Sequence, residues 1–193
     1  MRNILVTGGA GFVGSNLTLE LQARYPEARI VVVDDFRSGD FKNLRGFRGD
    51  VVAGDVSRLD WARQFGDRVF DGIFHLASIT DTTVHDQFLQ VHDNVEGFRR
   101  LLAFAEPNQT PVVYASSAAT YGMADGKQVE DQPPAPANVY AFSKVQLDNL
   151  AREQAGRNPA WRIVGLRYFN VYGPREGHKK AAASMIYQLY LQM

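Results

Sequence analysis

The chain has 193 residues, of which 45% are hydrophobic and 22% are charged. This balance is typical of one globular domain and excludes a disordered chain, a collagen-like repeat and a coiled-coil rod. Lysine plus arginine and aspartate plus glutamate number 21 each, so the net charge gives no attraction to nucleic acid or to an acidic membrane. A small polar ligand is therefore the expected partner.

The residue types also limit the chemistry and the location. Without cysteine, disulfides and thiolate metal sites are excluded. The four histidines, His75, His85, His92 and His178, lack metal-ligand spacing, so no metal site is expected. No apolar run approaches the roughly 18 residues that a membrane span needs, and we expect a cytoplasmic protein.

Short runs rich in β-branched residues alternate with longer segments of helical period. The expected strands cover residues 4–7, 30–33, 51–53, 72–75, 112–115 and 163–167, and the expected helices cover 14–24, 59–64, 92–105 and 139–155. This alternation predicts an α/β fold with a doubly wound parallel sheet, a Rossmann fold, over residues 1–193. Three prolines within residues 125–137 predict a loop before the last long helix.

Residues 184–193 place apolar side chains at helical spacing but end without a glycine, a proline or a basic last turn. An apolar helix face needs a cover. We therefore expect the chain to be the first domain of a longer polypeptide whose substrate domain follows. The alternative is an end that packs on the sheet.

A glycine-rich segment, TGGAGFVG at residues 7–14, follows the first expected strand and opens the first helix. Its glycines allow a tight turn, close approach of backbone N–H groups to a pyrophosphate, and packing of the helix on the strand. Asp34 lies 20 residues past Gly14, where a carboxylate accepts hydrogen bonds from ribose hydroxyls. The expected cofactor-binding residues here are Gly8, Gly11, Phe12, Val13, Gly14, Asp34 and Asp35. A turn that serves only packing is the alternative.

The choice between NAD and NADP stays open in the sequence. Asp34 repels a ribose 2′-phosphate, whereas Arg37 and Lys42 would neutralise one unless they belong to a solvated basic face. Asp55 and Val56, after the third expected strand, suit a carboxylate near the adenine amino group with an apolar wall beside it. A helix N-cap explains Asp55 equally well.

Tyr140 and Lys144 lie four residues apart in an expected helix and so point from one face. For Tyr140 to accept an alcohol proton near neutral pH, its pKa must fall by about 3 units from about 10, and a nearby ammonium in a dry cleft lowers it. Ser117, at the end of the fifth strand, is expected to orient the same reacting oxygen. A surface pair formed by chance is the alternative for Tyr140 and Lys144.

Four motifs together resemble the extended short-chain dehydrogenase/reductase family: TGGAGFVG at 7–14, HLAS at 75–78, YASSAATYG at 114–122 and YAFSK at 140–144. NVYAFSK at 138–144 and RYFNVYGPREGHKK at 167–180 are similar to the ADP-heptose 6-epimerases within it. The resemblance implies NADP or NAD as cofactor and an ADP-heptose-type nucleotide sugar as substrate. It further implies a homo-oligomer that acts in lipopolysaccharide-precursor synthesis.

The resemblance also assigns roles to residues. Tyr140 is one acid/base and Lys179 a second on the opposite face, while Lys144 anchors the cofactor ribose. The further cofactor contacts that it implies are Leu76, Ala77, Ser78, Asn94 and Val171, and the substrate contacts are Ser117, Asn170 and Gln188. Lys180 and Gln188 depart from the family pattern, which often has glycine and histidine there, so the sugar contacts stay open. A solvated basic run is the alternative for Lys179.

Two other functions remain compatible with these motifs. One is another sugar-nucleotide enzyme, a 4-epimerase or a 4,6-dehydratase, although Ala118, Ala119 and Thr120 lack the acidic pair that a dehydratase has after the serine. The other is a non-catalytic module that only binds a dinucleotide. Turnover of a sugar substrate separates these readings.

Overall fold

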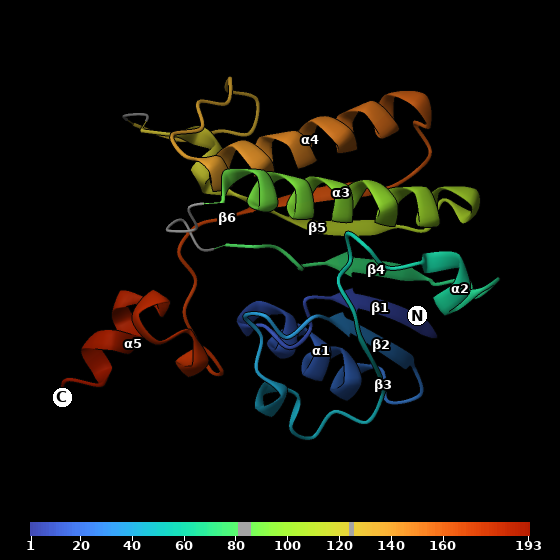
Figure 1. Ribbon diagram of the computed structural model, residues 1–193, viewed down its shortest axis with the longest axis horizontal. Helices are drawn as coiled ribbons and strands as arrows, with labels where there is room; N and C mark the ends of the chain where they lie inside the picture. Colours follow the sequence, from blue (N-terminus) through green and yellow to red (C-terminus); the bar gives the residue numbers. More distant parts are fainter. Residues whose placement is uncertain (81–85, 124–125) are drawn as a thin grey trace.

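Six parallel strands form one sheet in the order β3-β2-β1-β4-β5-β6 (Figure 1). The computed structural model describes residues 1–80, 86–123 and 126–193. The strands are β1 (Asn3–Thr7), β2 (Arg29–Asp34), β3 (Asp50–Ala53), β4 (Gly72–His75), β5 (Val112–Ser117) and β6 (Ile163–Tyr168). The strand order reverses between β1 and β4, which is the arrangement of a doubly wound Rossmann sheet. The predicted fold class is confirmed.

Five α-helices and four short 3-10 helices connect the strands in the described residues. The α-helices are α1 (Phe12–Arg24), α2 (Trp61–Phe65), α3 (Gln87–Ala105), α4 (Val139–Arg157) and α5 (Met185–Tyr190). The 3-10 helices are η1 (Phe41–Leu44), η2 (Glu106–Asn108), η3 (Ala118–Tyr121) and η4 (Gly177–Ala182). Figure 1 shows α3 and α4 side by side, and α5 at the edge of the molecule, apart from the sheet.

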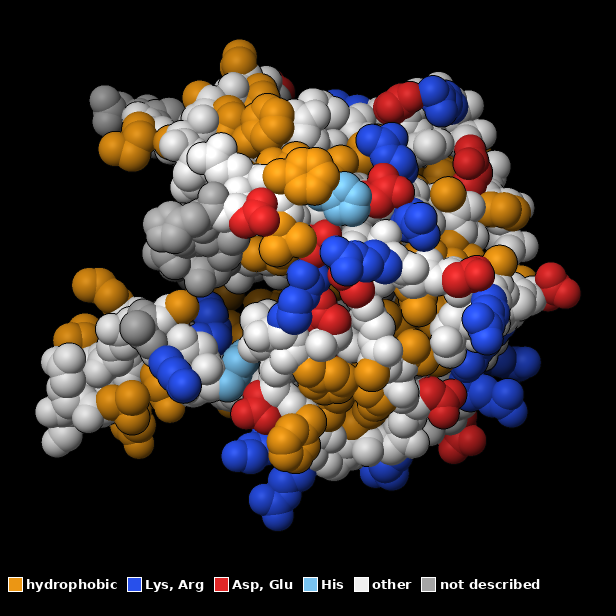
Figure 2. Space-filling model, in the orientation of Figure 1, with side chains coloured by type: hydrophobic (Ala, Val, Ile, Leu, Met, Phe, Trp, Pro, Cys, Tyr) orange, Lys and Arg blue, Asp and Glu red, His pale blue; other side chains and the backbone are white. Residues whose placement is uncertain are grey.

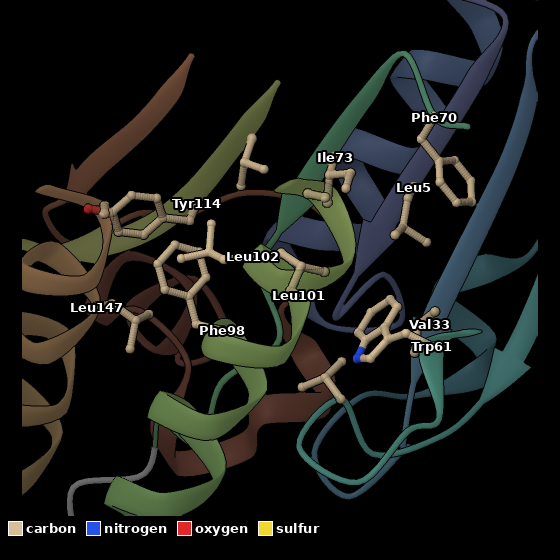
Figure 3. Packing of buried hydrophobic residues seen from close by; sticks show 14 of the residues in the cluster. Leu5, Val33, Trp61, Phe70, Ile73, Phe98, Leu101, Leu102, Tyr114 and Leu147 are labelled. Atoms are coloured by element: carbon tan, nitrogen blue, oxygen red, sulfur yellow. The ribbon is translucent and has the colours of Figure 1, made fainter. Parts of the chain in front are cut away.

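The larger part of the core lies between the sheet and α2, α3 and α4. Figure 3 shows Phe98 of α3 beside Tyr114 of β5, with ring centroids 4.7 Å apart. Trp61 of α2 packs into the same cluster with Val33 of β2. Because side chains alternate across a strand, neighbouring positions of β2 serve the other face, where Ile30 and Val32 pack with α1. The two faces of the sheet thus fix α1 on one side and α3 on the other.

The predicted element boundaries hold within two residues except at α3. The helix begins at Gln87, not at residue 92 as the sequence predicts, because Asp86 caps it by accepting a hydrogen bond from the Leu89 N–H at 2.8 Å. In the extra turn the apolar Phe88 is exposed and the polar Gln90 is buried. The helical period of buried apolar residues is therefore weak in this turn, and the sequence did not predict it as part of the helix.

The predicted loop over 125–137 begins at a residue outside the described range, and residues 126–137 form neither helix nor strand. Arg167 of β6 donates to the carbonyl of Glu130 at 3.2 Å and ties this segment to the sheet. The loop leads directly into α4, whose N-cap Asn138 accepts a hydrogen bond from the Ala141 N–H at 2.8 Å. The first turn of α4, with Tyr140, is thereby fixed at this edge of the sheet.

Ser184 is the N-cap of α5, and its hydroxyl accepts a hydrogen bond from the Tyr187 N–H at 3.1 Å. None of its residues is buried, and Met185 and Tyr190 are 74% and 72% exposed. The alternative of an end packed on the sheet is therefore wrong. Among the described residues, no helix combines the length and the apolar character that crossing a membrane requires.

Candidate active site

Two glycines of the β1–α1 turn, Gly8 and Gly14, lie where a side chain does not fit. Gly8 has φ +71°, and a Cβ there would meet the backbone nitrogen of Ala77 at 2.5 Å. A Cβ on Gly14 would lie 2.0 Å from the carbonyl oxygen of Gly8. The turn, the start of α1 and the segment after β4 therefore touch backbone to backbone, and only glycine permits this.

The N-terminus of α1 presents free backbone donors. Its N-cap is Gly11, and within the described residues no side chain caps the first turn. The first helical hydrogen bond runs from the Ser15 N–H to the Gly11 carbonyl at 3.0 Å, which leaves the N–H groups of Phe12, Val13 and Gly14 without helical partners. These donors and the helix dipole suit a pyrophosphate, so the predicted cradle fits a dinucleotide.

Asp34 ends β2 directly beside this turn and is 6% exposed. Its two carboxylate oxygens accept hydrogen bonds from the Ala10 N–H at 2.8 Å and from the Phe36 N–H at 2.9 Å. Burial raises the pKa of Asp34, and these backbone hydrogen bonds oppose the rise. A carboxylate has about four acceptor sites, so Asp34 fixes the glycine turn and keeps acceptor capacity for ribose hydroxyls.

Arg37, predicted to contact the cofactor, lies between three carboxylates. Its guanidinium lies 2.5 Å from Asp35, 2.7 Å from Asp93 and 3.5 Å from Asp55. Lys42 is exposed and forms no ion pair with any described residue. The two basic residues that the sequence analysis grouped together therefore have different environments.

Asp55 and Val56 follow β3, as the sequence predicts. Asp55 accepts hydrogen bonds from the N–H and the hydroxyl of Ser57 at 2.9 and 2.7 Å and so closes a local turn. The N-cap of α2 is Asp60, so the N-cap alternative for Asp55 is wrong. Val56 is 8% exposed and packs in the larger core cluster.

The segment after β4 carries Leu76, Ala77 and Ser78 past the glycine turn. Asn94 of α3 holds this segment: its side-chain oxygen accepts from the Ile79 N–H at 2.7 Å, and its amide donates to the Ile79 carbonyl at 3.1 Å. The same amide donates to the Ser143 hydroxyl of α4 at 3.0 Å. Asn94 of α3 thus joins the segment after β4 to α4.

Ser117, Tyr140 and Lys144 meet where β5 ends and α4 begins. Lys144 is 2% exposed, its Nζ donates to the Ala115 carbonyl at 2.8 Å, and the same nitrogen lies 5.6 Å from the centroid of the Tyr140 ring. Ser117 lies near enough to the Tyr140 hydroxyl to lower its pKa as a hydrogen-bond partner. The surface-pair alternative is therefore excluded, because the amine lies inside the protein.

Burial controls the protonation of this group. It raises the pKa of Tyr140, and the hydrogen bond with Ser117 offsets the rise in part. Burial also lowers the pKa of Lys144 to about 8, against the opposing charge of Asp148. The expected fall of the Tyr140 pKa is absent in this structure because the dry site penalises the phenolate, as it penalises the ammonium.

Comparison with known proteins identifies the family at this point. A profile of the NAD dependent epimerase/dehydratase family matches residues 4–193. The chain belongs to the NAD-dependent epimerase/dehydratase family. Its glycine turn, Asp34 and the Ser117–Tyr140–Lys144 group lie along the carboxyl ends of the strands, where doubly wound folds bind their ligands.

Solved structures of this family align closely with the chain. ADP-L-glycero-D-manno-heptose-6-epimerase of Helicobacter pylori has a TM-score of 0.90 and 44% identity, over 98% of this chain and 62% of that chain. UDP-N-acetylglucosamine 4-epimerase of Methanobrevibacter ruminantium has 0.82 and 26%, over 96% and 60%. UDP-glucuronic acid 4-epimerase of Bacillus cereus, in complex with NAD, has 0.80 and 29%, over 90% and 58%. The chain thus spans about 60% of the length of these relatives.

In this family member, the segment after β6 folds back toward α1. Lys179 lies with its Nζ 5.7 Å from the centroid of the Phe12 ring. Glu176, which is 2% exposed, accepts hydrogen bonds from the Gly173 N–H at 3.0 Å and the Ser184 N–H at 2.7 Å. Asn16 of α1 donates to the Pro174 carbonyl at 2.8 Å. These contacts bring Lys179 to the start of α1.

The other predicted residues of this segment lie nearer its surface. Asn170 and Val171 are exposed. Gln188 of α5 is half-buried and donates to the Ala183 carbonyl at 2.8 Å. The two predicted acid/base groups lie on different elements, Tyr140 on α4 and Lys179 on η4. Among the described residues no interaction joins them.

Sequence reasoning missed Asp93 and Glu176, two buried carboxylates that organise the site. Asp93 falls within the buried face of α3, in period with Asn94, Gly97 and Phe98, so an acidic residue on an apolar face was the available signal. Glu176 had no comparable periodic signal. His75, stacked on Phe98 with centroids 5.2 Å apart, is a core residue, and His85 lies outside the described residues.

Proposed function

We propose that the chain provides the cofactor-binding and catalytic residues of an ADP-heptose 6-epimerase that uses NAD or NADP. The observation that carries the proposal is the Ser117–Tyr140–Lys144 group, which lies on the same sheet edge as the glycine turn. The 44% identity to the H. pylori enzyme favours this reaction over that of the 4-epimerases, with 26% and 29%. A cytoplasmic homo-oligomer that acts in lipopolysaccharide-precursor synthesis is part of the proposal.

The residues that would hold the dinucleotide lie at the start of α1, at the end of β2 and in α4. The N–H groups at the start of α1 hold the pyrophosphate, and Asp34 accepts from the ribose hydroxyls. Lys144 donates to the second ribose from its buried position. A bound nicotinamide supplies the acceptor and donor of hydride.

The chain's own residues divide the proton transfers. Tyr140 would take the proton of the C6″ hydroxyl, which Ser117 orients by a hydrogen bond, while a bound oxidised nicotinamide would accept the C6″ hydrogen as hydride, so that C6″ becomes a ketone. The positive charge of that nicotinamide would lower the pKa of Tyr140, which burial raises. After rotation about C5–C6 the oxygen points to the other side, beyond the reach of Tyr140. Lys179, held on the far element by the Glu176 contacts, donates the proton in that pose.

The direct test is incubation of the full-length protein, with its expected substrate domain, with ADP-D-glycero-D-manno-heptose while NMR follows the configuration at C6″; the present chain alone is expected to bind the dinucleotide without turnover. We expect inversion at C6″ and no reaction with UDP-galactose. Activity with UDP-galactose alone favours a 4-epimerase. Dinucleotide binding without turnover of any sugar supports the binding module instead, and either result contradicts the proposal.

Substitution of the two acid/base residues tests the mechanism. Tyr140→Phe and Lys179→Met are each expected to reduce epimerisation by about 100-fold or more, as loss of a general acid or base does. Lys180→Met, the adjacent exposed lysine, is the matched control and should retain activity. Full activity in either variant removes that residue from the mechanism.

A further inference from the structure

The proposed second acid/base, Lys179, lies on the segment that connects β6 to α5. Figure 1 shows this segment leaving β6 and passing to the side of α1. Figure 2 shows basic side chains where the segment adjoins the rest of the molecule. Residues 169–184 contain only the short 3-10 helix η4, so contacts with other elements must fix the position of the Lys179 amine.

Asn16 of α1 makes the clearest of these contacts. Its amide nitrogen donates to the Pro174 carbonyl at 2.8 Å, and its side-chain oxygen accepts from the Nη1 atom of Arg175 at 2.8 Å. The same nitrogen donates to the Phe12 carbonyl at 2.9 Å. Because a primary amide has two N–H donors, both are used. One half-buried side chain therefore joins the first helix to the segment that carries Lys179.

A second amide reaches the segment from η1. Asn43 is buried, and its amide nitrogen donates to the Ala10 carbonyl of the glycine turn at 2.9 Å. The same nitrogen lies 3.1 Å from the Nδ1 atom of His178, the residue before Lys179. This Nδ1 atom also lies 2.9 Å from the Arg175 carbonyl. The segment thus meets the glycine-turn side of the molecule at two places.

The backbone of the segment adopts conformations that need such support. Arg175 and Lys180 have φ +70° and +51°, values that residues with a side chain rarely adopt. Such conformations persist where the surrounding structure imposes them. Glu176 shapes the segment through hydrogen bonds within it, whereas Asn16 attaches the shaped segment to α1.

Lys179 meets α1 at the same place. Its Nζ atom lies 5.7 Å from the centroid of the Phe12 ring, and the Phe12 carbonyl is one of the partners of Asn16. Phe12 is also the first residue of α1, whose N-terminal N–H groups form the expected pyrophosphate cradle. A single helix therefore supports both the expected cofactor site and the amine.

We infer that Asn16 is a positioning residue for Lys179: it fixes residues 173–184 on α1, so that the cofactor site and the second acid/base keep a constant relative position. The inference rests on the proposed epimerisation, in which Lys179 donates the second proton. Asn16 acts through Lys179 and not by contact with the reacting atoms. Proton transfer needs heavy atoms about 2.6–3.2 Å apart, and a misplacement of about 1 Å lowers a rate by as much as about 100-fold.

Hydrogen exchange of the full-length protein, followed by mass spectrometry, tests the attachment without any turnover. Asn16→Leu removes the hydrogen bonds of Asn16 and keeps a similar side-chain volume. We expect the amides of residues 173–184 to exchange at least about tenfold faster in this variant, because two hydrogen bonds across the contact are lost. Unchanged exchange in this segment overturns the inference, whatever reaction the enzyme catalyses.

Gln22→Met is the matched control. Gln22 is another half-buried amide of α1, and it joins the helix to a different loop by donating to the Gly46 carbonyl at 2.9 Å and accepting from the Arg48 N–H at 2.7 Å. This variant also loses two hydrogen bonds, yet it should leave exchange in residues 173–184 and turnover unchanged. An equal effect of both variants would mean a general loosening of α1 and contradicts the inference.

Turnover of ADP-D-glycero-D-manno-heptose by the full-length protein tests the catalytic step. We expect Asn16→Leu to lower kcat about tenfold, while calorimetry shows a change of less than about twofold in dinucleotide affinity. In a Lys179→Met background the same substitution should have no further effect, because Asn16 acts through Lys179. A full additional loss in that background, or a loss of affinity as large as the loss of kcat, contradicts the inference.

Two further results separate the possible failures. If the unmodified full-length protein does not turn over the sugar, the proposed function is wrong, and the exchange result alone decides whether Asn16 holds the segment. If Asn16→Leu does not fold, as circular dichroism would show, Arg175→Met replaces it. Arg175 is exposed, and its loss removes one of the two bonds across the contact. We expect exchange about threefold faster in residues 173–184, and no change there contradicts the inference.

Discussion

Arg167 and Asp148 form an ion pair whose side chains are only 11% and 8% exposed, and the two atoms Nη2 and Oδ2 lie 3.1 Å apart. Tyr114 donates its hydroxyl to the other oxygen of Asp148 at 2.9 Å. The guanidinium also lies 4.7 Å from the centroid of the Tyr121 ring. One arginine therefore joins β6, α4 and η3, and removing it leaves a carboxylate buried.

We expect Arg167→Met to lower the free energy of unfolding by about 3–5 kcal/mol, as loss of one partner of a buried ion pair does. Arg157→Met removes an exposed pair with Glu153 on the same helix as Asp148 and should cost at most about 0.5 kcal/mol. Urea unfolding measures both. Equal losses in the two variants would show that burial of the Arg167 pair is unimportant.

Lys144 gives a pH dependence with a definite sign. Its pKa is about 8 in the folded protein and 10.5 is the ordinary value, so between these pH values the unfolded chain binds more protons and stability rises with pH. Below pH 8 the cost of the buried ammonium, roughly 3 kcal/mol, is fully present. The stability that Lys144→Met gains relative to the unmodified protein should therefore be largest below pH 8 and decline toward pH 10.5.

Urea unfolding between pH 6.5 and 10 measures this difference. Lys127→Met, which removes an exposed lysine, is the control and should give a difference that does not depend on pH. If the curves for Lys144→Met and the unmodified protein run parallel, the amine titrates at its ordinary pKa and the account of its burial fails.

At the scale of elements, the contact between the β1 turn and α1 decides the shape of the cofactor cradle. A methyl group on Gly14 would meet the Gly8 carbonyl oxygen at 2.0 Å, whereas a methyl group on Gly156 of α4 would have open space around it. The two glycines therefore differ in the space available to a new methyl group.

We expect Gly14→Ala to destabilise the protein by about 1–3 kcal/mol and to weaken dinucleotide binding, because α1 must shift away from β1. Gly156→Ala should instead stabilise the protein by about 0.4–1 kcal/mol, because alanine restricts the unfolded chain and favours helix. Thermal unfolding measures both changes. If both substitutions act in the same direction, tight packing at Gly14 is not the reason for that glycine.

At the scale of the whole molecule, exposed apolar surface accompanies zero net charge. Val164 and Leu166 of β6 are 48% and 40% exposed, and Ile186 and Leu189 of α5 are 54% and 57% exposed. The formal net charge is +0, which gives no repulsion between molecules at neutral pH. Both properties favour self-association.

Deletion of residues 185–193 tests whether α5 contributes only to the surface, because no residue of α5 is buried. We expect the free energy of unfolding to change by less than about 0.5 kcal/mol, as for surface changes in general, and solubility at pH 7 to rise. Urea unfolding and the saturation concentration measure the two effects. A clear loss of stability would mean that α5 contributes to the core.

The sequence by itself determined the strands, the order of elements and the glycine turn. Alternating β-branched runs and helical periods are local properties, so they can be recognised in the sequence without knowledge of distant contacts. The steric need for glycine at residue 14 is likewise encoded in the turn itself, because a Cβ there would meet Gly8 and Gly9, whereas a Cβ on Gly8 would meet Ala77 of the distant segment after β4. The four motifs led to the family for the same reason, since each is contiguous along the chain.

Only the tertiary structure decided the electrostatics of the site. Arg37 and Asp93 are 56 residues apart in the chain, and no local pattern relates them. The direction of the Tyr140 pKa depends on burial, and the position of Lys179 beside Phe12 depends on the fold of the segment after β6. Charge, burial and the meeting of distant segments are set by packing in three dimensions, whereas propensity and turn chemistry are set by neighbours along the chain.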